Sequence, residues 1–308
     1  MPNFNGVWSL STQYQYAADW PTIPHLIMVA GGYGSNYTNQ VGTFLTGAGN
    51  NVADFGDLSA IRAYMAGYGN STRALFGGGY DGSSRVNTIE YFTFGSAGNA
   101  TDFGNLSAAR TTSIAVGNST RGVFGGGGEA NPVNVVEFVT IANTGNVTDF
   151  GDLTDARQEL GAVTSTTRGV FAGGGDPNAS NIMDYITIGS TGNATDFGDL
   201  VTAHKALAGC SSSTRGVFGG GDGDQDQIQF ITIASTGNAS AFGDLAVNRY
   251  YHGSGSDSTF GFFFGGIGPL NSIEKITIAS NGNGSDFGDL LSAVYGVSAA
   301  SANHGGIA

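Results

Sequence analysis

The fold is decided by Thr148-Asp149-Phe150-Gly151-Asp152-Leu153, because near copies of this stretch occur at five other places in the chain. The other copies are Asp54-Phe55-Gly56-Asp57-Leu58, Asp102-Phe103-Gly104-Asn105-Leu106, Asp196-Phe197-Gly198-Asp199-Leu200, Ala241-Phe242-Gly243-Asp244-Leu245 and Asp286-Phe287-Gly288-Asp289-Leu290. Successive copies are 48, 47, 47, 45 and 45 residues apart. A period of this length is typical of solenoids, propellers and other arrays. The chain is therefore a repeat protein, and we call this stretch the motif.

Each repeat predicts four short β-strands. One strand precedes a glycine pair, as Leu26 to Ala30 precede Gly31-Gly32. The next opens at an Asn or Asp that lies 15 residues before the motif, as in Asn181 to Ile188. A turn such as Thr191-Gly192-Asn193, whose residues tolerate a tight hairpin, then leads into the motif strand. A strand of small residues, such as Thr111 to Val116, completes the repeat.

Four strands per repeat, with a double glycine after one of them, resemble the blade of a kelch-type β-propeller. A β-helix would need shorter rungs, and a WD-repeat propeller would show Gly-His and Trp-Asp pairs, which are missing from the sequence. Residues 291–300, after the sixth motif, align with the small-residue strand of the other repeats. We therefore predict an all-β, six-bladed, kelch-like propeller over residues 25–308, in which the C-terminal strand closes the ring as the innermost strand of the first blade.

The differences in repeat length fall in one loop per blade, between the second and third strands. From the second conserved glycine position to the residue that opens the third strand there are 9, 8, 8, 6 and 6 residues in repeats two to six. These loops share one face of a propeller with the connections between blades, so we expect binding on that face. The acidic candidates in these loops are Asp81, Glu129, Asp176, Asp222 and Asp224.

Eight of the eleven cationic residues recur at two positions of the repeat. The first set lies four residues after the motif leucine, and comprises Arg62, Arg110, Arg157 and Arg249. The second set lies eleven residues after the repeat position that the first set occupies. It comprises Arg73, Arg121, Arg168 and Arg215. Such recurrence predicts a structural role, in which the arginines pair with the recurrent Asp residues or with backbone carbonyls at blade junctions.

Composition argues against several classes of function. The net charge is −13 and the only lysines are Lys205 and Lys275, so a continuous basic surface is missing and we predict no nucleic-acid partner. No apolar run approaches the ~20 residues that a membrane span needs, so we predict no membrane insertion. The N-terminus also lacks the pattern of a secretion signal. The single cysteine, Cys210, is expected to be a buried core residue.

Motifs for catalysis or metal binding are weak. The stretch Asp222-Gly223-Asp224-Gln225-Asp226 resembles part of a calcium loop but lacks the distal Glu, so we favour a solvated acidic loop. No histidine has a partner at metal-binding spacing; they are His25, His204, His252 and His304. We predict no cofactor and no enzymatic activity. A polysaccharide-degrading enzyme that uses Glu129, Asp176 and Asp222 as its acid and base is the weakest alternative.

Residues 1–24 lie outside the repeats and contain both tryptophans. Leu10, Tyr14 and Ala18 recur every four residues behind Ser9, which predicts a short amphipathic helix that ends at Trp20-Pro21. This N-terminal arm either covers one blade or docks onto a partner. Its candidate docking residues are Val7, Trp8, Leu10, Tyr14 and Trp20.

The opening from Phe4 to Tyr16, with its Gly6-Val7-Trp8 segment and the later Trp20-Pro21 pair, resembles the start of structural proteins of tailed bacteriophages. The repeats, with Thr-Arg-Gly-Val-Phe-Gly-Gly-Gly at residues 120–127, resemble those of virion or tail-associated phage propellers. The resemblance implies a non-enzymatic virion protein, part of the capsid decoration, tail or fibre, in multiple copies per particle. Its implied partners are other virion structural proteins and a host-surface glycan. A bacterial glycan-binding propeller lectin is the alternative.

Overall fold

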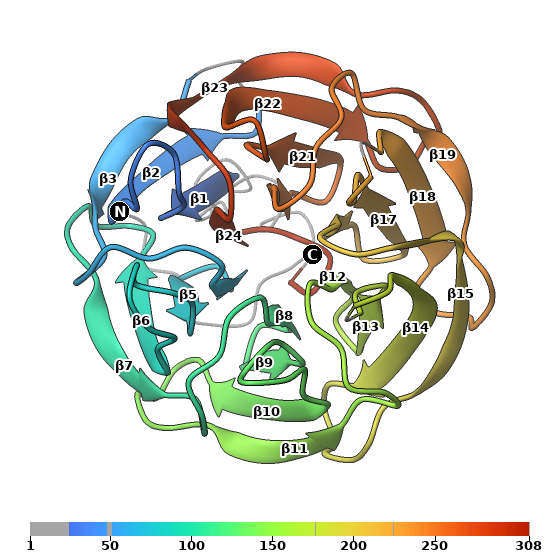
Figure 1. The fold of residues 1–308 in the computed structure, drawn as a ribbon, viewed down its shortest axis with the longest axis horizontal. Coiled ribbons are helices and arrows are strands. Elements are labelled where there is room, and N and C mark those ends of the chain that lie inside the picture. The colour runs from blue at the N-terminus through green and yellow to red at the C-terminus, as the bar shows by residue number, and fades with distance from the viewer. Residues whose placement is uncertain (1–24, 48–50, 176, 224, 308) are drawn as a thin grey trace, which may run out of the picture.

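The computed structural model describes residues 25–47, 51–175, 177–223 and 225–307. Among these residues there are strands and turns but no helix, and the strands form six four-stranded antiparallel sheets. The sheets stand around a common axis like the blades of a propeller (Figure 1). The predicted six-bladed all-β propeller is therefore confirmed, and the predicted helix within residues 1–24 lies outside the described residues.

Within each blade the strands run from the axis to the rim. The first blade contains β24 (Ser298–Ser301), β1 (Leu26–Ala30), β2 (Gln40–Leu45) and β3 (Ala53–Asp57). The second blade contains β4 (Ala66–Gly69), β5 (Arg73–Gly77), β6 (Thr88–Thr93) and β7 (Thr101–Asn105). The third blade contains β8 (Ile114–Gly117), β9 (Arg121–Gly125), β10 (Val135–Thr140) and β11 (Thr148–Asp152). The fourth contains β12 (Gly161–Thr164), β13 (Arg168–Ala172), β14 (Ser180–Thr187) and β15 (Thr195–His204). The fifth blade contains β16 (Ala208–Ser211), β17 (Arg215–Gly219), β18 (Gln227–Thr232) and β19 (Ser240–Asp244). The sixth blade contains β20 (Gly253–Ser256), β21 (Phe260–Phe264), β22 (Leu270–Thr277) and β23 (Ser285–Val294).

The ring is closed by the two ends of the repeat region. Strand β24 pairs antiparallel with β1, with Ser301 opposite Ile27 and Ser298 opposite Ala30. In Figure 1 the red β24 accordingly lies beside the blue β1. This pairing confirms that the C-terminal strand supplies the innermost strand of the first blade, and it leaves no blade with three strands.

The motif holds neighbouring blades together through its backbone. At the junction of blades three and four, the amide of Gly192 in the next blade's hairpin donates to the carbonyl of Phe150 at 2.8 Å. The amide of Asp152 donates to the side-chain oxygen of Asn193 in the same hairpin at 3.1 Å. Gly151 has a φ of 145°, and a Cβ there would lie only 2.6 Å from the carbonyl of Gly192. The motif therefore needs its glycine so that the hairpin can approach.

We call this contact the hairpin clamp, and it recurs at all six junctions. In each, the side-chain oxygen of an Asn in one hairpin accepts a hydrogen bond from a backbone amide of the preceding blade, that of the motif residue directly after the glycine. The distances are 3.0–3.2 Å. The accepting residues are Asn51, Asn99, Asn146, Asn193, Asn238 and Asn283. The clamp also uses backbone groups of the outermost strands that would otherwise be open to pairing with other chains.

The motif Phe and Leu fill the space between neighbouring sheets. Phe150 and Leu153 are buried against Leu160, Phe171 and Ile186, which belong to the connection and strands of the next blade. Burial of each such side chain contributes about 1.5–3 kcal/mol. The motif Phe therefore packs between the sheets of neighbouring blades.

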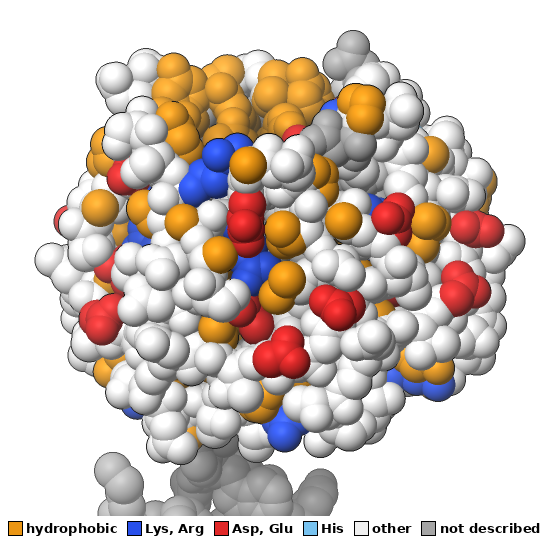
Figure 2. Space-filling view, turned by 60° about the horizontal axis from the view of Figure 1, so that its bottom comes forward, with side chains coloured by type: hydrophobic (Ala, Val, Ile, Leu, Met, Phe, Trp, Pro, Cys, Tyr) orange, Lys and Arg blue, Asp and Glu red, His pale blue; other side chains and the backbone are white. Residues whose placement is uncertain are grey.

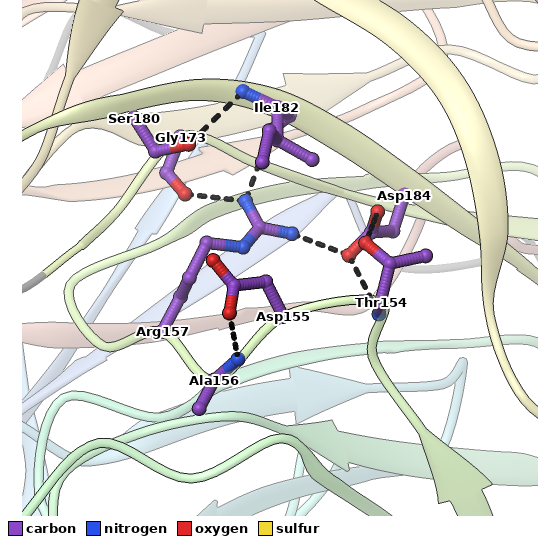
Figure 3. A network of polar contacts seen from close by, with 8 residues as sticks. All are labelled: Thr154, Asp155, Ala156, Arg157, Gly173, Ser180, Ile182 and Asp184. Atoms are coloured by element: carbon purple, nitrogen blue, oxygen red, sulfur yellow. Dashed lines mark hydrogen bonds and ion pairs between the residues drawn. The ribbon is translucent and has the colours of Figure 1, made fainter.

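The first set of arginines is buried at the junctions, as Figure 3 shows for Arg157. Its guanidinium forms an ion pair with Asp184 of the next blade. It also donates to the carbonyl oxygens of Gly173 at 2.5 Å and Ile182 at 2.9 Å. The hydroxyl of Thr154 donates to the same carboxylate at 2.5 Å. The buried charges are therefore paired and hydrogen-bonded, which is the condition for tolerating them in a core.

The same pairing joins Arg62 to Glu90, Arg110 to Glu137 and Arg249 to Glu274. The predicted position at blade junctions and the bonds to carbonyls are confirmed, but the predicted partners were wrong. The acids lie on the third strand of the next blade, whereas motif carboxylates such as Asp149 face solvent at the rim. An exposed carboxylate is hydrated and needs no partner, while a buried guanidinium must have one.

Two junctions lack the ion pair. Between blades four and five the equivalent positions of the repeat hold His204 and Gln229, and between blades six and one they hold Val294 and Gly42. At these two places the outermost strand is ten residues long, and it stays paired with the third strand as far as His204 or Val294. The expectation of four short strands was therefore wrong for blades four and six, because without the arginine the segment continues as a strand.

The second set of arginines lies at the start of the second strand. Each guanidinium stacks on an aromatic ring of the adjacent strand, with its central carbon 3.5–4.6 Å from the ring centroid. Each also donates to an isoleucine carbonyl of the next blade at 2.8–3.1 Å. In blade six the cation and the aromatic ring exchange strands. Phe260 starts the second strand, β21, and the ammonium of Lys275 on the third strand, β22, lies 4.8 Å from the centroid of the Phe260 ring. These carbonyl bonds were predicted; the aromatic stacking was not.

The residues after β24 close one end of the axis, and we call them the C-terminal plug. The Nε2 atom of His304 lies 2.7 Å from the carbonyl of Gly69, and the amide of Gly306 donates to its Nδ1 at 3.0 Å. The amide of Gly305 donates to the carbonyl of Ser211, on the far side of the ring, at 3.0 Å. The plug thus links blades two and five, and in Figure 1 the chain after β24 runs toward the centre of the ring.

Both ring nitrogens of His304 are satisfied only when the imidazole is neutral, and burial lowers its pKa to about 4. The unfolded chain takes up this proton near pH 6.5, so the free energy of unfolding should fall as the pH drops from about 6.5 to 4, by on the order of 3 kcal/mol for this group. Chemical denaturation at pH 7 and pH 4.5 measures the loss. His304→Gln, which does not titrate, should lose less between the two pH values; an equal loss would contradict this assignment.

The junction of blades five and six allows a test of the buried ion pair. Glu274→Gln alone should lower the free energy of unfolding by about 3–5 kcal/mol, because the Arg249 guanidinium stays buried without a charged partner. The double variant Arg249→His, Glu274→Gln places at this junction the residue types that occupy the equivalent positions between blades four and five, His204 and Gln229. In a thermodynamic cycle, the double variant should lose clearly less free energy of unfolding than the two single variants lose in sum. Additive losses would show that the two residues do not act as a pair.

Candidate functional site

The candidate site is the opening of the central axis on the face that carries the variable loops. A cavity of about 130 Å³ lies there. Each connection between blades contributes one equivalent residue to it, six positions after the motif leucine. We call these residues the mouth ring; they are Tyr64, Thr112, Glu159, Ala206, Tyr251 and Gly296. At the other end, the C-terminal plug closes the axis, so the cavity opens on the loop face.

The backbones of the mouth ring are joined in a closed circle. The amide of each member donates to the carbonyl of the preceding one, at 2.7–3.2 Å, and Tyr64 completes the circle by donating to Gly296. All six residues have a left-handed backbone, with φ between 50° and 62°. The left-handed conformation turns each amide toward the neighbouring connection, so the circle and the backbone conformation require each other.

Five of the six left-handed residues carry side chains, at a cost of roughly 1–2 kcal/mol each relative to glycine. Glycine occurs only at Gly296, where a Cβ would lie 2.8 Å from the ring of Tyr64. The fold therefore accepts glycine at this position but retains Tyr, Thr, Glu and Ala elsewhere. Strained residues that cluster at an opening indicate that their side chains serve a function.

The side chains of the mouth ring contact one another across the opening. The rings of Tyr64 and Tyr251 pack edge to face, with centroids 5.4 Å apart. The hydroxyl of Tyr251 donates to Oε1 of Glu159 at 2.5 Å. The ammonium of Lys205 lies 3.7 Å from Oε2 of the same carboxylate. The opening is thus bridged by an aromatic pair and a charged group.

Both tyrosines of the mouth ring stay protonated. Burial raises the pKa of Tyr251, and the neighbouring carboxylate of Glu159 raises it further. Burial likewise raises the pKa of Tyr64, with an added contribution from Tyr295. The two phenols are therefore hydrogen-bond donors at any physiological pH and are unsuited to act as bases.

A continuous row of seven tyrosines runs from the mouth ring into the variable loops, and we call it the tyrosine row. Each ring is half-buried, and successive centroids lie 4.7–6.2 Å apart. In order, its members are Tyr80, Tyr37, Tyr33, Tyr295, Tyr64, Tyr251 and Tyr250. Figure 2 shows hydrophobic side chains, among which tyrosine is counted, gathered at the upper rim, above a mostly uncharged flank with scattered acidic side chains.

The face of the variable loops was predicted as the binding face, but the tyrosines on it were not predicted. A signal was present, because Tyr33 and Tyr80 directly follow conserved glycine pairs in repeats one and two. A second signal was the position six residues after the motif leucine, whose side chain differs from blade to blade while its neighbours repeat. Variation within a constant frame marks positions that are free to acquire a function.

The predicted acidic residues do not form one site. The carboxylate of Asp81 accepts the amides of Ser83 and Ser84 at 2.8 and 2.7 Å, and these bonds lower its pKa to about 2. It therefore shapes its own loop. Glu129 is half-buried on the corresponding loop of blade three.

Among the predicted acids, Asp222 has a link to the mouth ring through Lys205. Its carboxylate accepts the amide of Lys205 at 3.3 Å, and Lys205 in turn faces Glu159. Asp176 and Asp224 lie outside the described residues. Within the described residues no group of three or more His, Cys, Asp or Glu could hold a metal ion. The lone cysteine, Cys210, is free and buried as predicted.

The predicted docking residues Val7, Trp8, Leu10, Tyr14 and Trp20 lie outside the described residues. No helix in the described part of the chain is long and apolar enough to cross a membrane. Comparison with models of protein families and with curated proteins finds no match to this chain. The features that bear on function are therefore the geometry of the mouth ring and the tyrosine row, together with the resemblance of the opening residues.

The strain of the mouth ring predicts opposite effects at two equivalent positions. Thr112→Gly should raise the free energy of unfolding by about 0.5–1 kcal/mol, since it relieves a left-handed backbone and removes a hydroxyl bonded only to the preceding carbonyl. Gly296→Ala should lower it by about 1–3 kcal/mol, because it adds both the left-handed penalty and a clash with Tyr64. Urea denaturation measures both changes. Equal signs would contradict this account of the ring.

Proposed function

We propose that this protein is a non-enzymatic structural component of a bacteriophage particle, in its capsid decoration, tail or fibre, and that its tyrosine row contacts a host surface. One observation carries the proposal: the chain enters the propeller on one face of the disc, and the mouth ring lies on the other. His25 precedes β1 at the face of the C-terminal plug, where its carbonyl accepts the amide of Thr46. The mouth ring lies on the opposite face.

This separation supports an anchor on one side and recognition on the other. Residues 1–24 join the propeller through His25, so an attachment made by them would leave the mouth ring directed away from the particle. The opening residues are also the part that resembles tailed-phage structural proteins. A rigid disc held by six hairpin clamps is well suited to present a surface at a fixed orientation.

An enzymatic function has less support. Of the predicted acid and base residues, Glu129 and Asp222 lie on loops of different blades, and Asp176 lies outside the described residues. The tyrosines of the mouth ring stay protonated and suit binding better than proton transfer. Catalysis therefore has no pair of described groups to carry it.

A glycan-binding lectin outside any particle is the second candidate. The tyrosine row favours it, because such a surface would serve a free lectin as well as a virion protein. The two candidates differ in whether the chain is incorporated into particles through residues 1–24.

Incorporation into particles can be measured directly. Quantitative mass spectrometry of purified phage particles should find this chain at a fixed ratio to the major capsid protein. A chain that lacks residues 1–24 should keep its thermal unfolding transition but fail to be incorporated. Absence of the chain from the particles, or equal incorporation of the truncated chain, would contradict the proposal.

A further inference from the structure

We propose that the mouth ring and the tyrosine row form a binding site for an uncharged saccharide, whose terminal sugar enters the mouth. The inference rests on the proposed function of this face as a host contact and specifies its ligand. The tyrosine row would support successive sugars of the chain. The hydroxyls of the mouth would bind the terminal one.

The tyrosine row has the surface that a sugar needs. A pyranose has one face of C–H groups and a periphery of hydroxyls, so it is matched by an aromatic ring with a polar edge. Tyrosine offers both, in a side chain with only two rotatable angles, and therefore loses little entropy on binding. Successive rings such as Tyr33 and Tyr295 pack edge to face at 5.3 Å, which holds them rigid before any ligand arrives.

The mouth adds polar groups that orient a ligand. The side chain of Glu159 is only 10% exposed, and its Oε2 has no hydrogen-bond donor within bonding distance among the described residues, with the Lys205 ammonium 3.7 Å away. A buried carboxylate oxygen without a donor is costly. A sugar hydroxyl in the cavity lined by Glu159 would be such a donor, while the phenol of Tyr251 stays on Oε1.

The charges of this face favour an uncharged ligand. Glu159 lines the mouth, and Asp81, Glu129 and Asp222 stand on the surrounding loops. The cation at the mouth, Lys205, already faces Glu159; Arg85 stands on the same loop as Asp81, and the whole chain carries a net charge of −13. A sialylated or sulfated glycan would therefore meet repulsion, whereas a neutral hexose chain would not.

The size of the cavity favours a saccharide over a protein partner. A volume of about 130 Å³ admits a small group, and the tyrosine row continues beyond it through successive ring contacts to Tyr80. A linear chain of small rings follows such a shape. A protein surface would cover the loops broadly and would leave the cavity unfilled.

The test uses the full chain on an array of neutral oligosaccharides of glucose, galactose and mannose, with sialylated and sulfated glycans as comparison. We expect binding to a neutral member and none to the anionic ones. Titration calorimetry with the bound oligosaccharide should then show at least a tenfold loss of affinity for Tyr251→Phe and for Glu159→Gln. Tyr33→Ala, further along the row, should weaken a longer oligosaccharide more than its terminal disaccharide.

Tyr185→Phe is the matched control. It removes a phenol from the opposite end of a blade, at a position where other blades carry Phe138 and Phe230, and should change neither affinity nor stability. Thermal unfolding identifies variants that fail to fold. If a mouth-ring variant does not fold, Tyr33→Ala, which lies outside the mouth ring, remains as an independent test.

Preference for anionic glycans, binding unaffected by all three variants, or binding to host surface protein alone would overturn the inference. The outcome is separable from the proposed function. Particles that contain the chain but bind no neutral glycan contradict only the ligand, while a chain that binds glycan but is absent from particles contradicts only the virion role.

Discussion

The structure depends on the hairpin clamp, the contact by which each blade holds the outermost strand of the blade before it. The clamp occurs at all six junctions, including the one between the last blade and the first, whereas the buried arginine pair occurs at four. Several backbone bonds per junction, each with a net contribution of about 1 kcal/mol, thus repeat around the ring. The motif glycine recurs because a Cβ there would clash with the hairpin, and the hairpin Asn recurs because its side-chain oxygen accepts the motif amide.

A junction held by backbone groups leaves side chains free to differ. The two equivalent buried positions at a junction hold the ion pair of Arg157 with Asp184 in one place, His204 and Gln229 in another, and Val294 and Gly42 in a third. The mouth ring shows the same freedom, since its backbone circle is closed by six amides whatever the side chain. Symmetry of the backbone with asymmetry of the side chains is what allows a repeat protein to build a single site on its axis. The tyrosine row is such a departure from symmetry.

Much of the fold could be predicted from periodicity. The strand at Leu26–Ala30 has the predicted bounds, the third strands begin within one residue of the expected Asn or Asp, and the C-terminal strand closes the ring. The partner of Arg157 could not be predicted, because spacing does not distinguish a buried acid such as Asp184 from an exposed motif carboxylate. The site was missed for a related reason: Tyr64 and Tyr251 are far apart in the sequence and meet only when the ring closes. The C-terminal plug has no counterpart in the repeats, so periodicity said nothing of it.

The central claim is that the two faces of the disc have different tasks, attachment at the face of His25 and recognition at the mouth ring. The most direct measurement is a density map of the intact particle at a resolution that orients the propeller. The account predicts that the plug face lies toward the particle and that the tyrosine row lies toward solvent. A propeller whose mouth ring is covered by a neighbouring virion protein would contradict it.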